Sequence, residues 1–236
     1  MQEDKVSENA HFVTLTYNTD HVPITKKGYM TLRKRDLQLF FKRLRKYHDK
    51  KFPDAKPIKY YAVGEYGSKT FRPHYHIIMF NCLDVVCIEK AWRINDKPIG
   101  DLHVGNVEAA SIGYTLKYIS KEKKIPMHKN DDRFPEFSLM SKGLGANYIN
   151  AYTKKWHYGD FHHRMYVMTS DGKKVSMPRY YKERIYTETD RKAIARVYRE
   201  NLAEKELNSQ DKRNLIQSHI AQFQKQKKKS NENGKI

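Results

Sequence analysis

The stretch that decides the fold is RPHYHIIMF, residues 72–80. Pro73 marks a turn, and the aromatic and apolar residues after it are typical of a β-strand. Successive side chains of a strand point to opposite faces, so His74 and His76 share one face. Two imidazoles on one face can bind the same ion. A His-x-His pair alone is weak evidence, because histidines on strands are more often simply packed or exposed.

A second strand-like run, Ile58 to Glu65, lies just before this stretch, and the loop YGSKTFRP joins the two. The glycine and proline of the loop favour a turn, which predicts an antiparallel hairpin. If Glu65 pairs with His74, then Val63 pairs with His76, and paired residues share a face. A carboxylate beside two imidazoles suits a divalent ion that keeps positions open for water and phosphate. We therefore expect Glu65, His74 and His76 to hold Mn²⁺ or Mg²⁺; the alternative for Glu65 is an ordinary carboxylate at a hairpin end.

A second motif, YTLKYISK at residues 114–121, contains the pattern Tyr-x-x-Lys twice. On a helix predicted from Ala109 to Lys121, the two tyrosines and two lysines form one stripe, and an apolar packing stripe that includes Leu116 lies opposite. A phenol is a poor nucleophile at its ordinary pKa of about 10, and nearby cations favour the phenolate and pair with phosphate. The alternative is an amphipathic helix with interfacial tyrosines and solvated lysines. The catalytic candidates are Tyr114, Lys117, Tyr118 and Lys121.

The rest of the chain predicts an α+β fold, a central antiparallel β-sheet flanked by helices with a C-terminal helical extension. Thr31 is expected to cap a helix whose apolar stripe includes Leu37, Phe40, Phe41 and Leu44. The other expected elements are a strand at His11–Asn18, a short helix at Val85–Trp92, a strand at Asp101–Val107, a loop at Ile125–Gly145, a hairpin of Arg164–Thr169 with Lys174–Met177, and a helix from Glu188 to about Lys225.

The charge balance points to a polyanionic partner. The 236 residues hold 46 Lys and Arg against 27 Asp and Glu, a formal charge of +19. Nucleic acid is the leading candidate, because ordinary charged surfaces mix both signs more evenly. The basic faces of the helix after Thr31 are as consistent with a solvated surface as with a DNA contact, and the total charge favours DNA. The predicted DNA-binding residues are Arg33, Lys34, Arg35, Lys42, Arg43 and Arg72.

Several classes of protein are disfavoured. Cys82 and Cys87 are the only cysteines, so a structural zinc site lacks its second pair and a reduced cytosolic protein is the simplest interpretation. No apolar run approaches the roughly 20 residues needed to cross a bilayer. A Gly-rich phosphate loop is also missing, so an attached ATP-driven helicase is not supported.

Three motifs together resemble a known family. FVTLTY at residues 12–17, RPHYHIIMF and YTLKYISK resemble, in this order, the motifs of HUH rolling-circle replication initiators. Among these, the chain is most similar to replication proteins of the gokushovirus branch of the Microviridae. The segments GEYGSKTFRPHYH, SLMSKGLGANYI at 138–149 and MPRYYKERIY at 177–186 support this resemblance, which covers roughly residues 12–186.

The resemblance implies a Rep-like fold and a specific reaction. A tyrosine attacks a phosphodiester of single-stranded origin DNA, which leaves a 5′-phosphotyrosine link and a free 3′-hydroxyl that primes synthesis. His74, His76 and Glu65 would be the ligands, and Tyr114 and Tyr118 the nucleophiles, with the second tyrosine releasing unit-length strands. Thr14, Thr16 and Tyr17 are assigned no catalysis. The implied partners are origin DNA and the host helicase and polymerase, in the cytoplasm of a bacterial host and without a membrane.

The expected organisation is a disordered N-terminus at 1–10, an HUH endonuclease domain at 11–187, a helical extension at 188–225 and a basic disordered tail at 226–236. Two other functions stay open. One is a non-catalytic single-strand binding module that stacks bases on Trp92, Tyr148 and Trp156. The other keeps the same chemistry in a transposase or a mobilisation relaxase.

Overall fold

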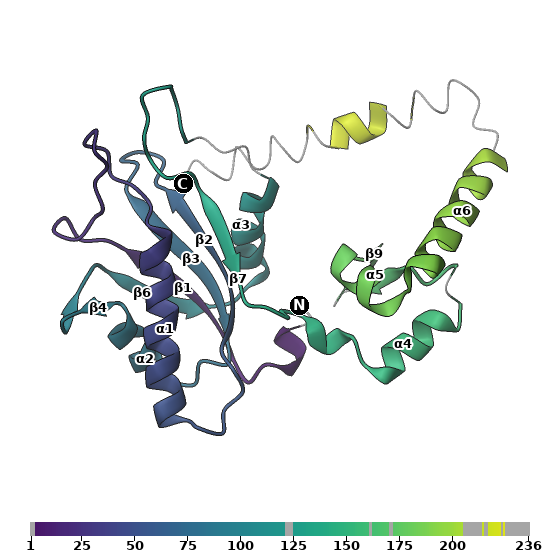
Figure 1. The fold of residues 1–236 in the computed structure, drawn as a ribbon, viewed down its shortest axis with the longest axis horizontal. Helices are drawn as coiled ribbons and strands as arrows, with labels where there is room; N and C mark the ends of the chain where they lie inside the picture. The colour runs from purple at the N-terminus through teal and green to yellow at the C-terminus, as the bar shows by residue number, and fades with distance from the viewer. Residues whose placement is uncertain are drawn as a thin grey trace. The chain divides into compact units, whose positions relative to one another are not determined.

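The computed structural model describes residues 3–120, 125–160, 162–169, 172–204, 214, 217–222 and 224. They form two compact units (Figure 1). Each unit has its own cluster of buried hydrophobic residues. The sheet unit comprises Val6–Leu144. The helical unit begins at Gly145 and includes residues 3–5.

The sheet unit is built on five antiparallel strands in the order β6-β1-β3-β2-β7, so the strand with the two histidines is central. The strands are β1 (Ala10–Thr16), β2 (Lys59–Tyr66), β3 (Pro73–Phe80), β6 (Leu102–Asn106) and β7 (Phe137–Met140). A two-stranded hairpin of β4 (Arg93–Ile94) and β5 (Lys97–Pro98) precedes β6 in the chain.

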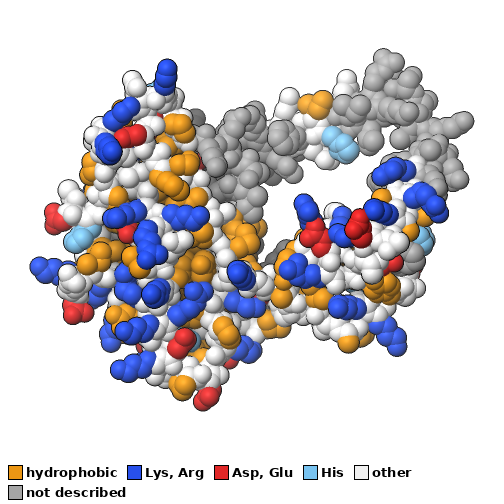
Figure 2. Space-filling model, viewed as in Figure 1, with side chains coloured by type: hydrophobic (Ala, Val, Ile, Leu, Met, Phe, Trp, Pro, Cys, Tyr) orange, Lys and Arg blue, Asp and Glu red, His pale blue; other side chains and the backbone are white. Residues whose placement is uncertain are grey.

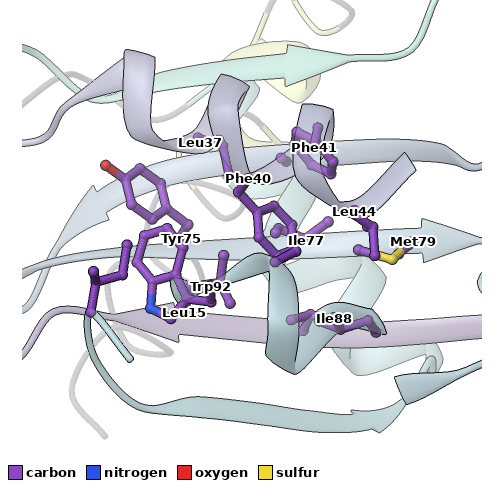
Figure 3. Packing of buried hydrophobic residues seen from close by; sticks show 14 of the residues in the cluster. Leu15, Leu37, Phe40, Phe41, Leu44, Tyr75, Ile77, Met79, Ile88 and Trp92 are labelled. Carbon is purple, nitrogen blue, oxygen red and sulfur yellow. The ribbon is translucent and has the colours of Figure 1, made fainter. Parts of the chain in front are cut away.

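Two helices cover one face of the sheet: α1 (Lys34–Lys51) and α2 (Val85–Ala91). The side chains of β3 that alternate with the histidines point into this core, where they meet the apolar stripe of α1 (Figure 3). Trp92, just after α2, is 1% exposed, and its indole N–H donates to the Thr16 carbonyl at 2.9 Å. The labelled core residues are Leu15, Leu37, Phe40, Phe41, Leu44, Tyr75, Ile77, Met79, Ile88 and Trp92.

A buried hydrogen-bond network ties α1 to the sheet on this same face. The Tyr17 hydroxyl donates to Asp36 at 2.9 Å and lies 2.8 Å from the Tyr75 hydroxyl. The Tyr75 hydroxyl also bonds the backbone N–H and carbonyl of Arg33, each at 3.1 Å. Burial, followed by the neighbouring hydroxyl and carboxylate, raises the pKa of Tyr17. This tyrosine is therefore a neutral group that links the sheet to α1.

The helix α3 (Ala109–Ser120) packs on the opposite face, against β2, β3 and β7. Tyr114 of α3 reaches Glu65, which shares its face with His74. Leu116, expected on the packing side of this helix, is 43% exposed, so that expectation is wrong. Tyr114 instead faces the sheet, where its partner is a carboxylate that the apolar pattern of the helix does not reveal.

Most expected elements are confirmed, and two are wrong. The hairpin has the expected register, Glu65 opposite His74 and Val63 opposite His76. The stretch 125–145, expected to be a loop, contains the edge strand β7, which is too short for its alternation to stand out. Thr31 does not cap α1; Arg33 precedes the helix, and the Thr31 hydroxyl instead accepts from the Phe134 N–H at 2.8 Å.

The helical unit has a small core of its own. Its elements are α4 (Ala151–Tyr158), the hairpin β8 (Tyr166–Met168) with β9 (Lys174–Ser176), α5 (Arg179–Ile185) and α6 (Glu188–Glu204), preceded by a 3-10 turn at Ala146–Tyr148. His157 of α4 is fully buried between the Tyr148 hydroxyl, at 2.9 Å, and the Arg164 carbonyl, at 2.7 Å. Burial lowers the pKa of His157, which keeps it neutral.

The boundary at Gly145 falls inside the range 11–187 for which the sequence predicts one domain. Hydrophobic periodicity shows which residues are buried but not which cluster they join, so it does not reveal such a division. Near the N-terminus, Asp4–Val6 form a 3-10 turn, and Glu3 accepts a hydrogen bond from the Gly145 N–H at 2.7 Å. Residues 205–213 and 225–236 lie outside the described part of the chain. Among the described helices, none has the length and apolar character needed to span a membrane.

The close approach of residue 100 to β1 gives a test of the sheet unit. A Cβ at Gly100 would lie 1.9 Å from the Thr16 carbonyl oxygen, whereas a Cβ at Gly113 of α3 would meet nothing within 4 Å. We expect Gly100→Ala to lower the free energy of unfolding by about 1–3 kcal/mol, and Gly113→Ala to raise it by about 0.5–1 kcal/mol through helix propensity. Urea denaturation of both variants measures this. Equal stabilities would contradict the packing of residue 100 against β1.

Candidate active site

Three side chains from the β2–β3 hairpin converge on one point. The Nε2 atoms of His74 and His76 each lie 2.8 Å from Oε1 of Glu65, and the three ligand atoms all lie within 4.8 Å of one another. The Glu65 side chain is 2% exposed, while those of His74 and His76 are 19% and 12% exposed. The site is therefore walled by the sheet and open toward solvent on the histidine side.

Hydrogen bonds at the far ring nitrogens orient the imidazoles. Nδ1 of His74 lies 3.1 Å from the Arg72 carbonyl, which can only accept, so this nitrogen carries the proton. Nε2 of the same ring then faces Oε1 of Glu65 at 2.8 Å. Nδ1 of His76 lies 3.0 Å from the hydroxyl of Thr14 on β1, which can accept its proton in the same way. The Phe12 ring stacks on His76 at 5.6 Å with an interplanar angle of 5°.

These groups fit a bound cation. Burial by itself would raise the pKa of Glu65, but the interactions with His74 and His76 lower it to about 2, so the group is a carboxylate at neutral pH. Nε2 of His76 is buried and, despite its closeness to Glu65, makes no hydrogen bond within the described part of the chain. A divalent ion among these three atoms would supply positive charge to the same carboxylate in place of imidazole protons. Two nitrogens and one oxygen form a ligand set that Mn²⁺ and related divalent ions accept.

Tyr114 completes the cluster. Its hydroxyl donates to Oε1 of Glu65 at 2.6 Å, and its ring meets the His76 ring edge to face at 5.1 Å. Burial, followed by the Glu65 charge and hydrogen bond, raises the pKa of Tyr114. The phenol is therefore neutral in this arrangement. Positive charge at the cluster would weaken the hold of Glu65 on the proton and make the oxygen more nucleophilic.

The sequence did not predict that two further residues lie at the site. Thr14, to which the sequence assigns no catalytic role, makes a hydrogen bond with His76. Glu136, one position before β7, is 8% exposed, and its charge adds to the rise in the Tyr114 pKa. Period-two alternation in FVTLTY places Phe12 and Thr14 on one strand face, but only the strand order puts that face beside the histidines. No sequence signal pointed to Glu136.

The other predicted residues lie in different places. Lys117 and Tyr118 belong to α3, but their side chains, and Lys121 as a whole, fall outside the described part of the chain. The cations of α1 lie on the helix that packs against the sheet face opposite the histidines, so they do not join the Glu65 cluster. Arg43 donates to the Ala91 carbonyl at 2.8 Å and Arg72 to the Tyr17 carbonyl at 2.9 Å, which gives both a structural role. Their contact with DNA stays a prediction, as it does for Arg33, Lys34, Arg35 and Lys42.

The sequence matches known phage replication proteins. Residues 10–123 match the family model of the replication-associated protein ORF2, and this range contains β1, the hairpin and α3. The chain is similar to replication-associated proteins of phages. It is 32% identical over 193 residues to the replication-associated protein ORF2 of Spiroplasma virus 4, covering 75% of this chain and 58% of the relative. The chain thus spans a little over half the length of that relative.

Two further relatives agree. The replication-associated protein VP4 of Bdellovibrio phage phiMH2K is 25% identical over 240 residues, covering 95% of this chain and 69% of the relative. The replication-associated protein ORF4 of Chlamydia phage 1 is 25% identical over 205 residues, covering 77% of this chain and 47% of the relative. These phages are Microviridae, which confirms the expected resemblance. No solved structure matches the chain.

The Thr14 contact predicts an effect on metal affinity. Thr14→Val keeps the shape but removes the group that fixes the His76 ring, so we expect the Kd for Mn²⁺ to rise by about 10-fold or more. Thr14→Ser keeps the hydroxyl and should change the Kd much less. Thr16→Val is the matched control on the same strand face, because the Thr16 hydroxyl bonds the Asp101 backbone instead. Titration calorimetry measures all three, and equal affinities for the Val and Ser variants at position 14 would contradict this role.

Proposed function

We propose that this protein initiates replication of a small circular single-stranded DNA phage genome by nicking and rejoining the DNA with a tyrosine nucleophile. The observation that supports it is the position of Tyr114, whose hydroxyl bonds the carboxylate that also faces both histidines. A nucleophile beside a candidate metal cluster is the arrangement that phosphodiester transfer needs. The names of the relatives favour replication over the transposase and relaxase alternatives, which share these residues.

The reaction conserves the phosphodiester bond energy. The phenolic oxygen of Tyr114 attacks phosphorus, the bond from phosphorus to the 3′-oxygen breaks, and the 3′-oxygen takes up a proton. The products are a 5′-phosphotyrosine and a free 3′-hydroxyl that can prime synthesis. Attack of a 3′-hydroxyl on the phosphotyrosine reverses these changes and rejoins the strand, so no nucleotide cofactor is required.

Residues of the chain set up this attack. Glu65 accepts the phenolic hydrogen bond and so holds the Tyr114 oxygen at the cluster. Thr14 and the Arg72 carbonyl orient the two imidazoles. Mn²⁺ or Mg²⁺, held by Glu65, His74 and His76, would polarise the phosphate and offset the negative charge that builds up in the transition state. Tyr118 follows Tyr114 by one helical turn, about 6 Å along the axis, so a second attack from the same helix is geometrically reasonable.

Basic surface would hold the DNA. Lys and Arg side chains cover much of the viewed face of both units, with few acidic side chains among them (Figure 2). Neutralising phosphates dominates single-strand affinity and does not depend on the metal cluster. The proposal includes origin DNA as substrate, the host helicase and polymerase as partners, and the bacterial cytoplasm as location.

Incubation with labelled single-stranded origin DNA and Mn²⁺, followed by a denaturing gel, tests the function. We expect a covalent adduct with the 5′ end of the cleaved product, which disappears on chelation of the metal. His74→Ala and His76→Ala should each abolish the adduct while DNA affinity stays within about threefold, because phosphate contacts dominate binding. Cleavage without trapped protein would mean that water attacks, and binding without either product would indicate a non-catalytic module.

The two tyrosines give a matched pair of variants. Because Tyr114 contacts Glu65, we expect Tyr114→Phe to slow single-turnover adduct formation by about 100-fold or more. Tyr118→Phe should still nick a short oligonucleotide but fail to release repeated unit-length strands. The double variant should form no adduct. Normal adduct formation by Tyr114→Phe would show that another residue makes the first attack.

A further inference from the structure

The helical unit carries a row of cations and aromatic rings that the proposed reaction does not use. The Arg164 guanidinium lies over the Trp156 ring at 4.9 Å, and the Trp156 and Tyr166 rings meet edge to face at 5.6 Å. The Lys174 ammonium lies over the Tyr166 ring at 4.6 Å. The row therefore runs cation, ring, ring, cation across α4 and the β8–β9 hairpin.

Helix α4 extends this row. Tyr152 lies one helical turn before Trp156, so the two share a helix face, and Lys155 lies on the same side. Tyr152 is 77% exposed, so its ring is accessible to a ligand. Below, the Trp156 patch means Tyr152, Lys155, Trp156, Arg164, Tyr166 and Lys174.

The cations of the patch form no ion pairs with acidic side chains in the described residues; Asp160, whose pKa is lowered first by its hydrogen bond with His163 and also by the Arg164 charge, is a nearby carboxylate. No carboxylate described by the structure forms an ion pair with Lys155, Arg164 or Lys174. Elsewhere in the helical unit, Arg179 pairs with Glu183, and Lys192 pairs with Glu188 at 2.7 Å. The patch cations are held by aromatic faces and backbone instead; one Arg164 N–H donates to the Trp156 carbonyl at 2.8 Å.

The charge of the surrounding chain has the same sign. Residues 145–199 contain 12 Lys and Arg against 5 Asp and Glu. Unpaired cations beside half-exposed rings are what proteins use to bind single strands, because bases stack on the rings and phosphates pair with the cations. The bases of a duplex are stacked inside it, so a duplex would contact only the cations of the patch and not the aromatic rings.

We propose that the Trp156 patch is a second binding surface for single-stranded DNA, separate from the Glu65 cluster. The choice of DNA rests on the proposed function, whereas stacking and phosphate pairing rest on the patch itself. Such a surface would raise affinity for longer strands by adding a second contact to the same molecule. It would leave cleavage of a short oligonucleotide that reaches only the Glu65 cluster unchanged.

Tryptophan fluorescence of the full chain tests the surface, because the chain has only two tryptophans and Trp92 is 1% exposed. Titration with an oligothymidylate in the absence of metal should quench the Trp156 emission. Trp92→Phe should keep the quenching and Trp156→Phe should remove it. A duplex of equal length should quench much less. No quenching at oligonucleotide concentrations that saturate binding would overturn the proposal.

Charge variants avoid disturbing the fold. Lys155→Ala with Lys174→Ala removes two unpaired cations of the patch, and Arg179→Ala with Lys192→Ala removes two paired cations of the same unit. The first double variant should lower the slope of log affinity against log salt by roughly 0.7 for each phosphate that is no longer neutralised. The second should leave the slope nearly unchanged. Equal slopes for both would show that general charge, not the patch, binds the strand.

The outcome separates this proposal from the proposed function. Quenching that is retained while no covalent adduct forms would leave the patch as a DNA-binding surface and remove the nuclease proposal. Adduct formation without quenching would support the nuclease proposal and remove the patch as a DNA-binding surface. Both double variants should nick a short oligonucleotide at the wild-type rate. If only the variant with Lys155→Ala and Lys174→Ala nicked more slowly, the patch would take part in the reaction, which would contradict a separate surface.

Discussion

The arrangement of the site depends on one interaction, the pairing of Glu65 with His74 across the β2–β3 hairpin. A shift of this register by one residue would turn the carboxylate or the imidazoles to the opposite face. The other face of β3 prevents such a shift, because Tyr75, Ile77 and Met79 are fully buried there against α1. The tyrosine network through Tyr17 anchors that helix to the same strand. Packing on one face of the sheet thus sets the register that places Glu65 and the two histidines together on the other face.

The negative charge of Glu65 accounts for the rest of the cluster. It accepts a hydrogen bond from the Tyr114 hydroxyl, which helps to place α3 on the sheet with Tyr114 inward and Leu116 outward. It also raises the pKa of the nucleophile that the proposed reaction requires. If Tyr114 stays neutral until a divalent ion binds, attack on DNA would occur only in the metal-bound protein. Thr14 and Phe12 contribute from β1 by holding the His76 ring.

The sequence predicts local geometry well and long-range neighbours poorly. The shared face of His74 and His76 follows from strand periodicity, and the assumed register, Glu65 opposite His74, is the one observed. Thr14 is missed because its role depends on β1 lying beside β3, which strand periodicity does not specify. The β7 strand is missed because four residues that alternate between half-buried and exposed resemble a loop. The expectation for Leu116 of α3 is wrong, because helical periodicity does not reveal that Tyr114 has a carboxylate partner on the sheet.

The central claim is that Glu65, His74 and His76 hold one divalent ion beside Tyr114. Electron spin-echo spectroscopy of the Mn²⁺-loaded protein tests it most directly, with ¹⁵N-labelled histidine to assign the nitrogen couplings. The account predicts couplings from two imidazole nitrogens, reduced to one in His76→Ala, and a further change in the Mn²⁺ spectrum in Glu65→Gln. Mn²⁺ that binds without any imidazole coupling would contradict the site.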